Sequence, residues 1–490
     1  MVPVSFDLSR PLPLQPRQWQ RQLIQLLRTR LGQAGTQGQD VLIHAGPGAG
    51  KTLGALLAIW RLQQDRRIGR YVVFCHRTAI AAQWIKAAAR LDLRLAEWSL
   101  DSADALHAAA ADQGLLLSYQ TAALHQPRLQ ALLQGWSATP WMAVADEVHH
   151  LGVDPEEPEA AAWGHAFSTI SGSAALRLGL TGTPFRADQL AFCAARRQPR
   201  RDGDQITWQI VPDLCVEPRE LIAAGDVRPL EFRFQDGWVD HARPDAPAAP
   251  EAERSCLSAE TRESWRARNL RRAIRLGDAS SIALRVLLQA RRGLERVRQQ
   301  HAQAGGLVIA RDIAHARQIA QLLQDEGDQA LLVHSLDPEA GERMHAFHQG
   351  QGDWLVSIDM CSEGFDAPRL RVVAYLSTVV TRSRFVQAIT RAVRLEGDRC
   401  AQEAIPRDAS LVFAPADPLL LGHARSWSIS EPYLLRGTSP APLIDPLHGG
   451  GRAGPLPLAA VDQEAGAVIA LGGPQLPGFV GSTAPQRRPA

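Results

Sequence analysis

The stretch Asp40–Thr52, with the sequence DVLIHAGPGAGKT, decides how the surrounding chain folds. Its first half is apolar and predicts a buried strand, and its second half is a glycine-rich turn ending in Lys-Thr before a helical stretch at 53–64. Glycines let backbone N–H groups curl around a phosphate, and the amino end of the next helix favours the same anion. A strand, a glycine-rich loop and a helix in this order predict a Walker A phosphate-binding loop.

Each residue type in this loop has a chemical reason to be there. The residues expected around the phosphates are Gly46, Gly48, Gly50, Lys51 and Thr52. Lys51 is expected to reach the β- and γ-phosphates, and the Thr52 hydroxyl to ligate Mg²⁺. Of the 53 basic residues only Lys51 and Lys86 are lysine. A compact ammonium fits between phosphates where the broad guanidinium fork does not. The loop therefore predicts binding of a ligand with β- and γ-phosphates together with Mg²⁺.

Length and composition limit the number of domains and the classes of protein to which the chain can belong. A chain of 490 residues predicts two or three domains. The six cysteines form no Cys-x-x-Cys pair, which argues against a structural zinc site and favours a reducing cytoplasm. No apolar run reaches the ~18 residues of a membrane span, and the N-terminus does not resemble a signal peptide. The scarcity of lysine argues against a nuclease site that combines two carboxylates with a separate lysine.

Short apolar strands alternate with helices in two parts of the chain, which predicts two parallel-sheet α/β domains. The expected strands are 41–45, 71–75, 115–118, 142–145 and 176–180 in the first part and 307–310, 330–334, 355–358, 372–376 and 411–413 in the second. We expect a first domain at 1–190, a linker and Arg-rich helical insertion at 191–300, a second domain at 301–425 and a flexible Gly/Pro-rich tail at 426–490.

Two adjacent acids, Asp146 and Glu147, follow the apolar strand 142–145. The carboxyl end of a parallel strand is where α/β proteins bind ligands. Asp146 is expected to hold Mg²⁺, and Glu147 to orient and deprotonate the attacking water. A solvated acidic loop is the alternative, but a position at a strand end, after the phosphate loop, favours catalysis.

These motifs together resemble the superfamily 2 helicase/translocase core of the DExH type, and most closely the type III restriction enzyme helicase-subunit group and related DNA-repair helicases. Asp146–His149 resembles motif II, and Leu180–Arg186 resembles motif III with Gly182 where alanine is commoner. Pro16–Gln20 is similar to the adenine-side motif of the family, which implies that Gln20 reads adenine.

The rest of the resemblance runs in the family's order over about residues 14–415. Segments 74–84 and 118–121 resemble motifs Ia and Ib, 307–311 motif IV, 356–368 motif V and 387–394 motif VI, in which Thr390 stands where glycine is usual. The resemblance implies two tandem RecA-like domains with ATP at their interface. It also implies that Arg391 and Arg394 act as arginine fingers, and that Gly364 and Asp366 lie near the nucleotide.

The family's path for a nucleic-acid strand can be carried over in the same way. The residues implied to line it are Arg77, Thr78, Gln83, Tyr119, Gln120, Thr121 and Ser362. Those implied to couple hydrolysis to strand movement are His149, Thr181, Thr183 and Gln387. Trp84 is a candidate for base stacking, although core packing on a helix is the favoured interpretation. The 12 arginines of Arg254–Arg298 fit equally a solvated helix or a nucleic-acid contact.

The resulting hypothesis is an ATP-hydrolysing enzyme that moves along or unwinds nucleic acid, with DNA expected over RNA as partner. One alternative is a motor subunit in a restriction or defence assembly, beside a methyltransferase or nuclease subunit and without unwinding of its own. Another is a nucleotide-gated scaffold that binds nucleic acid. The intact set of phosphate-loop, acidic and arginine residues argues against the scaffold.

Overall fold

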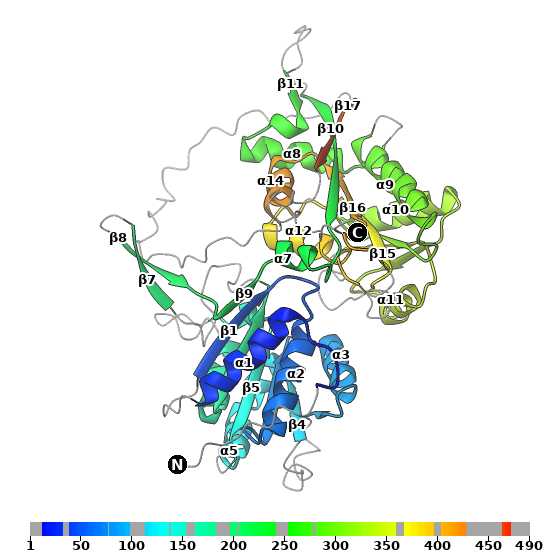
Figure 1. Ribbon diagram of the computed structural model, residues 1–490. Coiled ribbons are helices and arrows are strands. Elements are labelled where there is room, and N and C mark those ends of the chain that lie inside the picture. The colour runs from blue at the N-terminus through cyan, green and yellow to red at the C-terminus, as the bar shows by residue number, and fades with distance from the viewer. Residues whose placement is uncertain are drawn as a thin grey trace, which may run out of the picture. The chain divides into compact units, whose positions relative to one another are not determined.

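The structure is a computed structural model whose described residues form two compact units, one up to Glu217 and the other from Pro218 (Figure 1). It describes residues 12–32, 39–76, 78–98, 113–136, 139–152, 162–182, 197–202, 205–241, 253–277, 281–358, 367–395, 403–427 and 463–471. No helix in these ranges combines the length and the apolar character that a bilayer crossing requires.

The first unit is built on a seven-stranded sheet in which every pairing is parallel. Across the sheet its strands are β3 (Arg94–Glu97), β4 (Gln113–Ser118), β2 (Arg70–Cys75), β5 (Trp141–Asp146), β6 (Leu176–Thr181), β1 (Gln39–Ala45) and β9 (Leu214–Val216). The five strands expected from apolar runs are all present, because a parallel sheet covered on both faces needs apolar side chains throughout.

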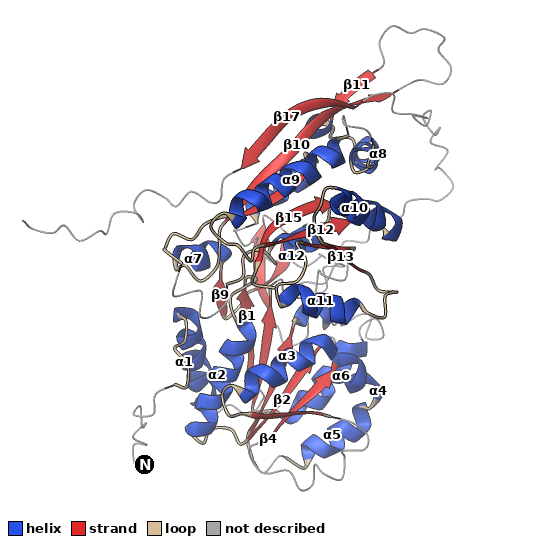
Figure 2. Ribbon diagram, turned by 90° about the vertical axis from the view of Figure 1, so that its right-hand side faces the viewer, coloured by secondary structure: helices blue, strands red, loops and turns tan. Residues whose placement is uncertain are grey.

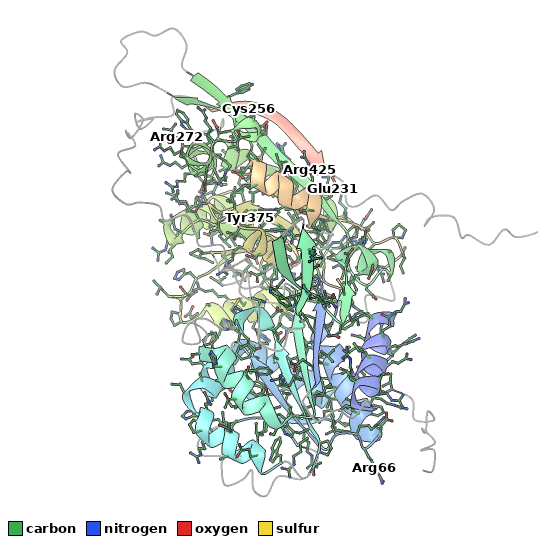
Figure 3. The ribbon with its side chains drawn as sticks, turned by 90° about the vertical axis from the view of Figure 1, so that its left-hand side faces the viewer. Arg66, Glu231, Cys256, Arg272, Tyr375 and Arg425 are labelled. Carbon is green, nitrogen blue, oxygen red and sulfur yellow. The ribbon has the colours of Figure 1, made fainter. Side chains whose placement is uncertain are left out.

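Helices and a small hairpin complete this unit. The elements are α1 (Gln18–Gly32), α2 (Lys51–Gln64), α3 (Thr78–Ala89), α4 (Tyr119–Leu124), α5 (Gln126–Gln134), α6 (Ala162–Ile170), the 3₁₀ turns η2 (Val148–His150) and η4 (Ser171–Ser173), and the hairpin β7 (Arg197–Asp202) and β8 (Gln205–Ile210). Helices α1 and α2 lie side by side (Figures 1 and 2), while α6 packs on α4 and α5. Arg66 projects away from the ribbon just beyond the end of α2 (Figure 3).

The second unit contains an eight-stranded sheet. Across it run β11 (Glu253–Cys256), β10 (Leu230–His241), β16 (Ser410–Pro415), β15 (Leu370–Leu376), β12 (Gly305–Ala310), β14 (Trp354–Ser357) and β13 (Ala330–Val333), with β17 (Gln463–Leu471) also paired to β10. The pairings of β10 with β11 and β17 are antiparallel, and the others are parallel. Figure 2 shows β10 and β17 side by side. Two parallel-sheet units confirm the expected α/β fold.

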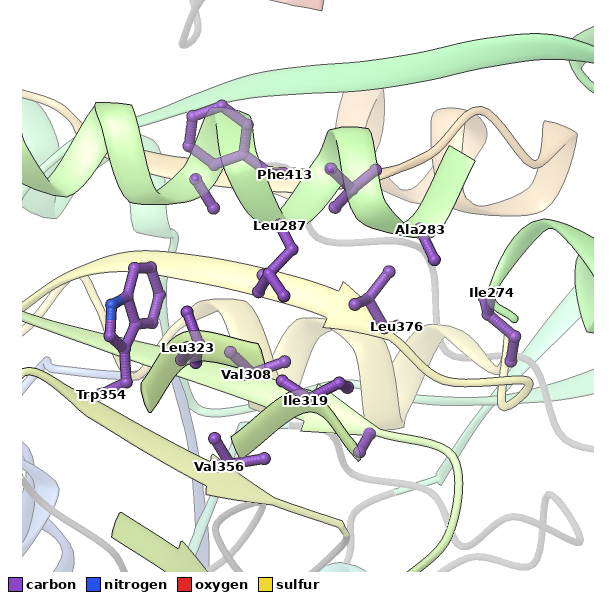
Figure 4. Close-up of a cluster of buried hydrophobic side chains, with 14 of the residues drawn as sticks. Ile274, Ala283, Leu287, Val308, Ile319, Leu323, Trp354, Val356, Leu376 and Phe413 are labelled. Carbon is purple, nitrogen blue, oxygen red and sulfur yellow. The ribbon is translucent and has the colours of Figure 1, made fainter. Parts of the chain in front are cut away.

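The core of the second unit lies between this sheet and its helices. These are α7 (Pro218–Ala223), α8 (Glu263–Ala273), α9 (Ile282–Arg298), α10 (Ile313–Asp325), α11 (Ala340–His348), α12 (Arg382–Ile389) and α14 (Pro418–Ser426), with the 3₁₀ turn η5 (Leu257–Ala259). Leu287 of α9 lies close to Leu376 of β15 in a cluster that also holds Ile319 of α10 (Figure 4). Gly293 lets α9 approach β16, because a Cβ there would lie 2.9 Å from the Phe413 ring.

The segment expected as a linker and insertion, 191–300, is divided between the two units. Its strand β10 lies parallel to β16 inside the second sheet, and α9 packs against β15 and β16. Alternate residues Leu230, Phe232 and Phe234 are buried along β10. The second unit therefore begins near Pro218, upstream of the boundary expected at 301. Strand β17 lies in the segment expected as a flexible tail, most of which is outside the described residues.

A buried ion pair joins α8 to the start of α14 and gives a test of this packing. Arg266 donates to the Asp417 carboxylate at 2.8 Å, with side chains 9% and 0% exposed. Asp417 also caps α14 by accepting from the backbone N–H groups of Leu419 and Leu420. Asp417→Ala is expected to lower the free energy of unfolding by about 3 kcal/mol, because it leaves a buried guanidinium without its partner.

Urea denaturation of the full chain measures this loss. The control is Glu339→Ala, which removes an exposed partner of Arg343 and is expected to cost about 0.5 kcal/mol or less. Equal losses in the two variants would show that the buried pair contributes nothing beyond an exposed one.

Candidate active site

The glycine-rich loop connects β1 to α2 in the first unit. Gly48 and Gly50 have φ angles of 76° and 78°, in the left-handed region that glycine adopts without a Cβ penalty. The loop begins where the Gly46 N–H donates to the Val216 carbonyl of β9 at 3.1 Å. The chain thus curls into the conformation that the phosphate-loop prediction requires, directly before the amino end of α2.

Arg17 and the first turn of α1 hold this loop by three hydrogen bonds to its carbonyl groups. Arg17 Nη1 donates to Gly48 O at 2.6 Å, Trp19 Nε1 to Ala49 O at 3.0 Å, and Gln20 Nε2 to Gly50 O at 3.1 Å. Gln20 Oε1 accepts from the Arg17 N–H. Both ends of the Gln20 amide, expected to read adenine, are therefore engaged with protein. Sequence reasoning did not identify Arg17 and Trp19, which share this role.

Lys51, motif II and motif III meet through a chain of polar contacts. Lys51 Nζ lies 3.2 Å from Glu147 Oε1, and His149 Nδ1 lies 3.5 Å from Glu147 Oε2. The same His149 nitrogen is 3.4 Å from Thr181 Oγ1 at the end of β6. The structure thus brings together residues expected for phosphate binding, water activation and coupling.

Two buried aromatic residues donate hydrogen bonds to Asp146, one to its side chain and one to its backbone carbonyl. Trp84 Nε1 donates to Asp146 Oδ2 at 2.9 Å, and the Tyr119 hydroxyl donates to the Asp146 backbone carbonyl at 2.5 Å. Trp84 is 0% exposed and Tyr119 is 1% exposed. Trp84 is therefore a core residue, as the favoured interpretation had it. The Tyr119 ring is buried too, so in this structure it supports motif II and presents no face to a nucleic-acid base.

The two carboxylates differ in their electrostatic environment. Burial and the neighbouring Glu147 carboxylate raise the pKa of Asp146 above its ordinary value. Burial alone would raise the pKa of Glu147, but Lys51 and His149 lower it below its ordinary value. Glu147 also has a φ of 51°, in the left-handed region that costs a non-glycine residue about 1 kcal/mol or more. Such strain gathers at functional sites, where the surrounding structure holds it in place.

This charge arrangement fits a divalent cation. Asp146 keeps acceptor capacity beyond its bonds to Trp84 and the Glu147 N–H, and it is buried beside a second carboxylate. A carboxylate and a hydroxyl are hard oxygen ligands of the kind Mg²⁺ takes. Asp146 and Thr52 are the residues that would hold the ion, which when bound would neutralise phosphate charge.

Motif III lies directly against this centre. His44 Nε2 is 2.5 Å from the Gly182 carbonyl, and its Nδ1 is 3.3 Å from Cys215 Sγ. A Cβ added to Gly182 would lie 4.0 Å from Lys51 Nζ, an ordinary contact. The alanine common in the family would fit as well, so the glycine removes no contact that the fold depends on. His44 was not identified from the sequence.

Of the expected nucleic-acid residues, Thr78, Gln83, Tyr119, Gln120 and Thr121 lie in the described part of the chain. Thr78 begins α3, Gln83 is exposed on the same helix, and Gln120 is exposed on α4. The backbone N–H of Thr121 donates to Ser118 Oγ at 2.9 Å, so Ser118 caps the start of α4. The residues that lie outside the described part are Arg77, Thr183, Ser362, Gly364 and Asp366.

Motif VI lies in the second unit, at and after the end of α12. Gln387 is half-buried, Arg391 is 8% exposed, and Arg394 is partly exposed. Thr390 is buried and donates from Oγ1 to the Val386 carbonyl at 2.5 Å, so the threonine found in place of glycine satisfies its own hydroxyl. Arg228 holds the following turn by donating from its side chain to the Arg394 carbonyl.

The bond from Trp84 to Asp146 can be tested by Trp84→Phe. This change keeps an aromatic ring but leaves a buried carboxylate oxygen without its donor, which is expected to lower the free energy of unfolding by about 1–3 kcal/mol. The bond favours the ionised carboxylate, whose folded pKa is raised by burial. The loss is therefore expected to be larger at pH 8, where Asp146 is ionised in both states, than at pH 5.

Trp141→Phe is the matched control, and its denaturation is measured at the same two pH values, 5 and 8. Trp141 is 1% exposed, and its Nε1 has no hydrogen-bond partner among the described residues. Its replacement is expected to lose packing without a pH-dependent component. A loss for Trp84→Phe that is the same at pH 5 and pH 8 would contradict the assignment.

Comparison with known protein families matches both units. Residues 13–186 match the family described as type III restriction enzyme, res subunit, and residues 289–396 match the helicase conserved C-terminal domain. The chain belongs to the superfamily 2 helicases. Within this superfamily its motifs are those of the Res-like group, as the sequence predicted.

Relatives of this helicase occur in mycobacteria. It is 32% identical over 459 residues to "Uncharacterized protein MT2985" of Mycobacterium tuberculosis (strain CDC 1551 / Oshkosh), covering 92% of this chain and 68% of the relative. It is 30% identical over 454 residues to "Uncharacterized protein ML1624" of Mycobacterium leprae (strain TN), covering 91% and 68%.

Two solved structures share the fold of this helicase. A fragment of a putative HsdR subunit of a type I restriction enzyme from Vibrio vulnificus YJ016 matches with a TM-score of 0.51 at 15% identity, covering 85% of this chain and 67% of that one. The ATP-dependent Type ISP restriction-modification enzyme LlaBIII bound to DNA matches with a TM-score of 0.50 at 11% identity. The match covers 82% of the helicase but only 28% of that enzyme.

Proposed function

We propose that this superfamily 2 helicase hydrolyses ATP to move along or unwind DNA. The observation that carries the proposal is the contact chain from Lys51 through Glu147 and His149 to Thr181. It links the residue types that bind phosphate, activate water and sense the end of β6. A scaffold that bound nucleotide without turnover would not need Glu147 held in this position.

The ion pair between Lys51 and Glu147 suggests how ATP starts the reaction. Lys51 Nζ forms an ion pair with the Glu147 carboxylate at 3.2 Å. The β- and γ-phosphates of ATP would compete for the same ammonium. Released from Lys51, that Glu147 oxygen would be able to accept a proton from the attacking water, while His149 stays beside the other oxygen.

Motif II and motif III offer a route from hydrolysis to movement. His149 is 3.4 Å from Thr181, and the Gly182 carbonyl next to Thr181 is held by His44. A shift of Glu147 on hydrolysis would alter the His149 contact and thereby the end of β6. Coupling residues in other parts of the chain, Gln387 among them, belong to the same proposal through the family resemblance.

Two observations favour DNA over RNA. The residues of motif II (Asp146–His149) and of the upstream motif (Pro16–Gln20) resemble those of DNA-acting members of the family, and the fold is shared with a restriction enzyme bound to DNA. ATP turnover should be measured with single-stranded DNA, duplex DNA and RNA added in turn. Stimulation by DNA is expected, and stimulation by RNA alone would refute the DNA proposal. Strand-displacement and triplex-displacement assays then separate unwinding from translocation.

A second candidate is a motor subunit of a restriction or defence assembly. Both solved structures described above carry restriction-enzyme names, which favours this setting. The candidate predicts triplex displacement without strand displacement by the purified chain. It also predicts that DNA cleavage needs another polypeptide, which metal-dependent cleavage by the chain alone would contradict.

A further inference from the structure

A cavity of about 310 Å³ lies within the second unit, and its lining includes Pro368 at the end of motif V. It is found at the amino ends of β12 and β15, where His301 and Gln303 precede the first strand and Arg369 precedes the second. Arg371 of β15, Arg228 and Glu403 complete its polar lining. The opposite, carboxyl edge is where parallel sheets ordinarily bind their ligands, so this cavity calls for its own explanation.

The cavity holds an excess of buried positive charge. Arg228, Arg369 and Arg371 are 2%, 7% and 3% exposed. Glu403 is the acid in the lining, and it pairs with Arg228 at 2.7 Å. Three guanidinium groups therefore face one carboxylate.

The three arginines differ in how many hydrogen bonds their guanidinium groups make to the protein. Arg369 donates to the backbone carbonyls of Gln303, Phe347, Gln351 and Gly352, and so serves the fold. Arg228 binds Glu403 and the carbonyls of Pro368 and Arg394.

The Nε atoms of Arg228 and Arg371 are both buried and have no hydrogen-bond partner in the described part of the chain. Arg228 still bonds through its other guanidinium nitrogens, so the positive charge of Arg371 is the less compensated of the two. Burial and the adjacent Arg228 lower the pKa of Arg371 to about 10. A buried cation whose donors lack acceptors is costly, and a ligand that supplies acceptors would remove the cost.

We propose that this cavity binds a small anion that carries a phosphate group, with Arg371 as its principal ligand and Arg228 as the second. Phosphate oxygens match the planar donor fork of arginine and carry the charge that the lining lacks. The volume also leaves space for an organic part beyond the phosphate. A nucleic-acid backbone does not fit as well, because Arg371 is 3% exposed and can be reached only by a group that enters the cavity.

Occupancy of the cavity would act on motif VI. Arg228 donates from its backbone N–H to the Val393 carbonyl at 2.9 Å, and from its side chain to the Arg394 carbonyl. An anion that draws the Arg228 guanidinium toward itself would change how the turn at 390–395 is held. This regulatory part rests on the proposed function of Arg391 and Arg394, whereas the binding part does not.

The binding test uses the full chain carrying Lys51→Ala, so that the phosphate loop does not contribute. Inorganic phosphate and pyrophosphate are titrated calorimetrically into this chain and into the same chain with Arg371→Gln added. We expect saturable binding that becomes at least tenfold weaker without Arg371. The control is Arg292→Gln, which removes an exposed arginine from α9 in the same unit and should leave the affinity unchanged. Equal affinities with and without Arg371 would overturn the proposal.

If Arg371→Gln alters stability, the shift in melting temperature caused by phosphate provides a second test of binding. The chain with Arg371 should melt at a higher temperature as phosphate is added, and the chain with Arg371→Lys should show a smaller rise. No rise with Arg371 present refutes the site. A short DNA without terminal phosphate that binds in an Arg371-dependent way would instead assign the cavity to nucleic acid and refute a small ligand.

The regulatory part has its own measurement. ATP turnover of the chain with Lys51 intact should change at the anion concentrations that fill the cavity, and Arg371→Gln should abolish that change. Absence of turnover in every form would refute the proposed function and leave the binding titration to stand. Unaltered turnover at full occupancy would refute the regulatory role.

Discussion

Glu147→Gln is expected to lower ATP turnover by roughly 10²–10⁴-fold, the usual contribution of a general base. Glutamine keeps the size and can accept a hydrogen bond from Lys51, but it cannot take a proton from water. Nucleotide affinity should therefore be retained or rise, since the ion pair with Lys51 no longer competes with the phosphates. Single-turnover hydrolysis and binding of a fluorescent ATP analogue measure the two effects separately.

The control for this variant is Glu97→Gln, an exposed acid on β3 of the same sheet. It should leave both turnover and binding unchanged. Wild-type turnover in Glu147→Gln would refute the assignment of Glu147 as the base. Loss of nucleotide binding together with turnover would show that Glu147 acts in the fold of the loop instead.

Arg391→Gln and Arg394→Gln are each expected to lower turnover by up to about 10³–10⁵-fold, the range for arginine fingers in related phosphoryl transfer. The proposal is that both guanidinium groups stabilise charge on the γ-phosphate. Because this charge develops in the transition state, kcat should fall far more than nucleotide affinity. Steady-state kinetics with saturating DNA measure this.

Melting temperatures must accompany those kinetics, since Arg391 is 8% exposed and its replacement also removes buried contacts. Arg292→Gln, exposed on α9, is the control for lost positive charge. A fall in turnover that merely follows a fall in melting temperature would argue for a structural role. Activity near the parent's in both variants would refute the finger assignment.

How far the sequence predicts this protein depends on the kind of pattern it offers. Strands that are apolar throughout, such as 71–75 and 372–376, are predicted correctly. A short continuous apolar run is typical of a parallel strand that is buried on both faces of its sheet. Strand β10 was missed, although Leu230, Phe232 and Phe234 alternate with Glu231 and Arg233. That alternation is the period of a strand with one polar face, and Arg233 in fact pairs with Glu231 at 2.7 Å.

The site divides in the same way. The phosphate loop and the acidic pair are local motifs, so their spacing alone predicts their positions. The supports of these motifs come from distant segments, since Trp84 is 62 residues from Asp146 and Trp19 is 30 from Ala49. Nothing in the local sequence of a buried tryptophan tells which carboxylate or carbonyl its N–H will reach. Only the structure shows that Trp84, a candidate for base stacking, and Tyr119, implied to line the nucleic-acid path, both support motif II.

The bond from the Gly46 N–H to the Val216 carbonyl has one more consequence. Val216 is the last residue of β9, and the chain leaves the first unit at Glu217 to begin the second at Pro218. The first residue of the phosphate loop is thus hydrogen-bonded to a residue that lies two positions before the start of the second unit. A displacement of the loop on binding a phosphate is therefore expected to reach, through this bond, the residues where the chain passes into the second unit.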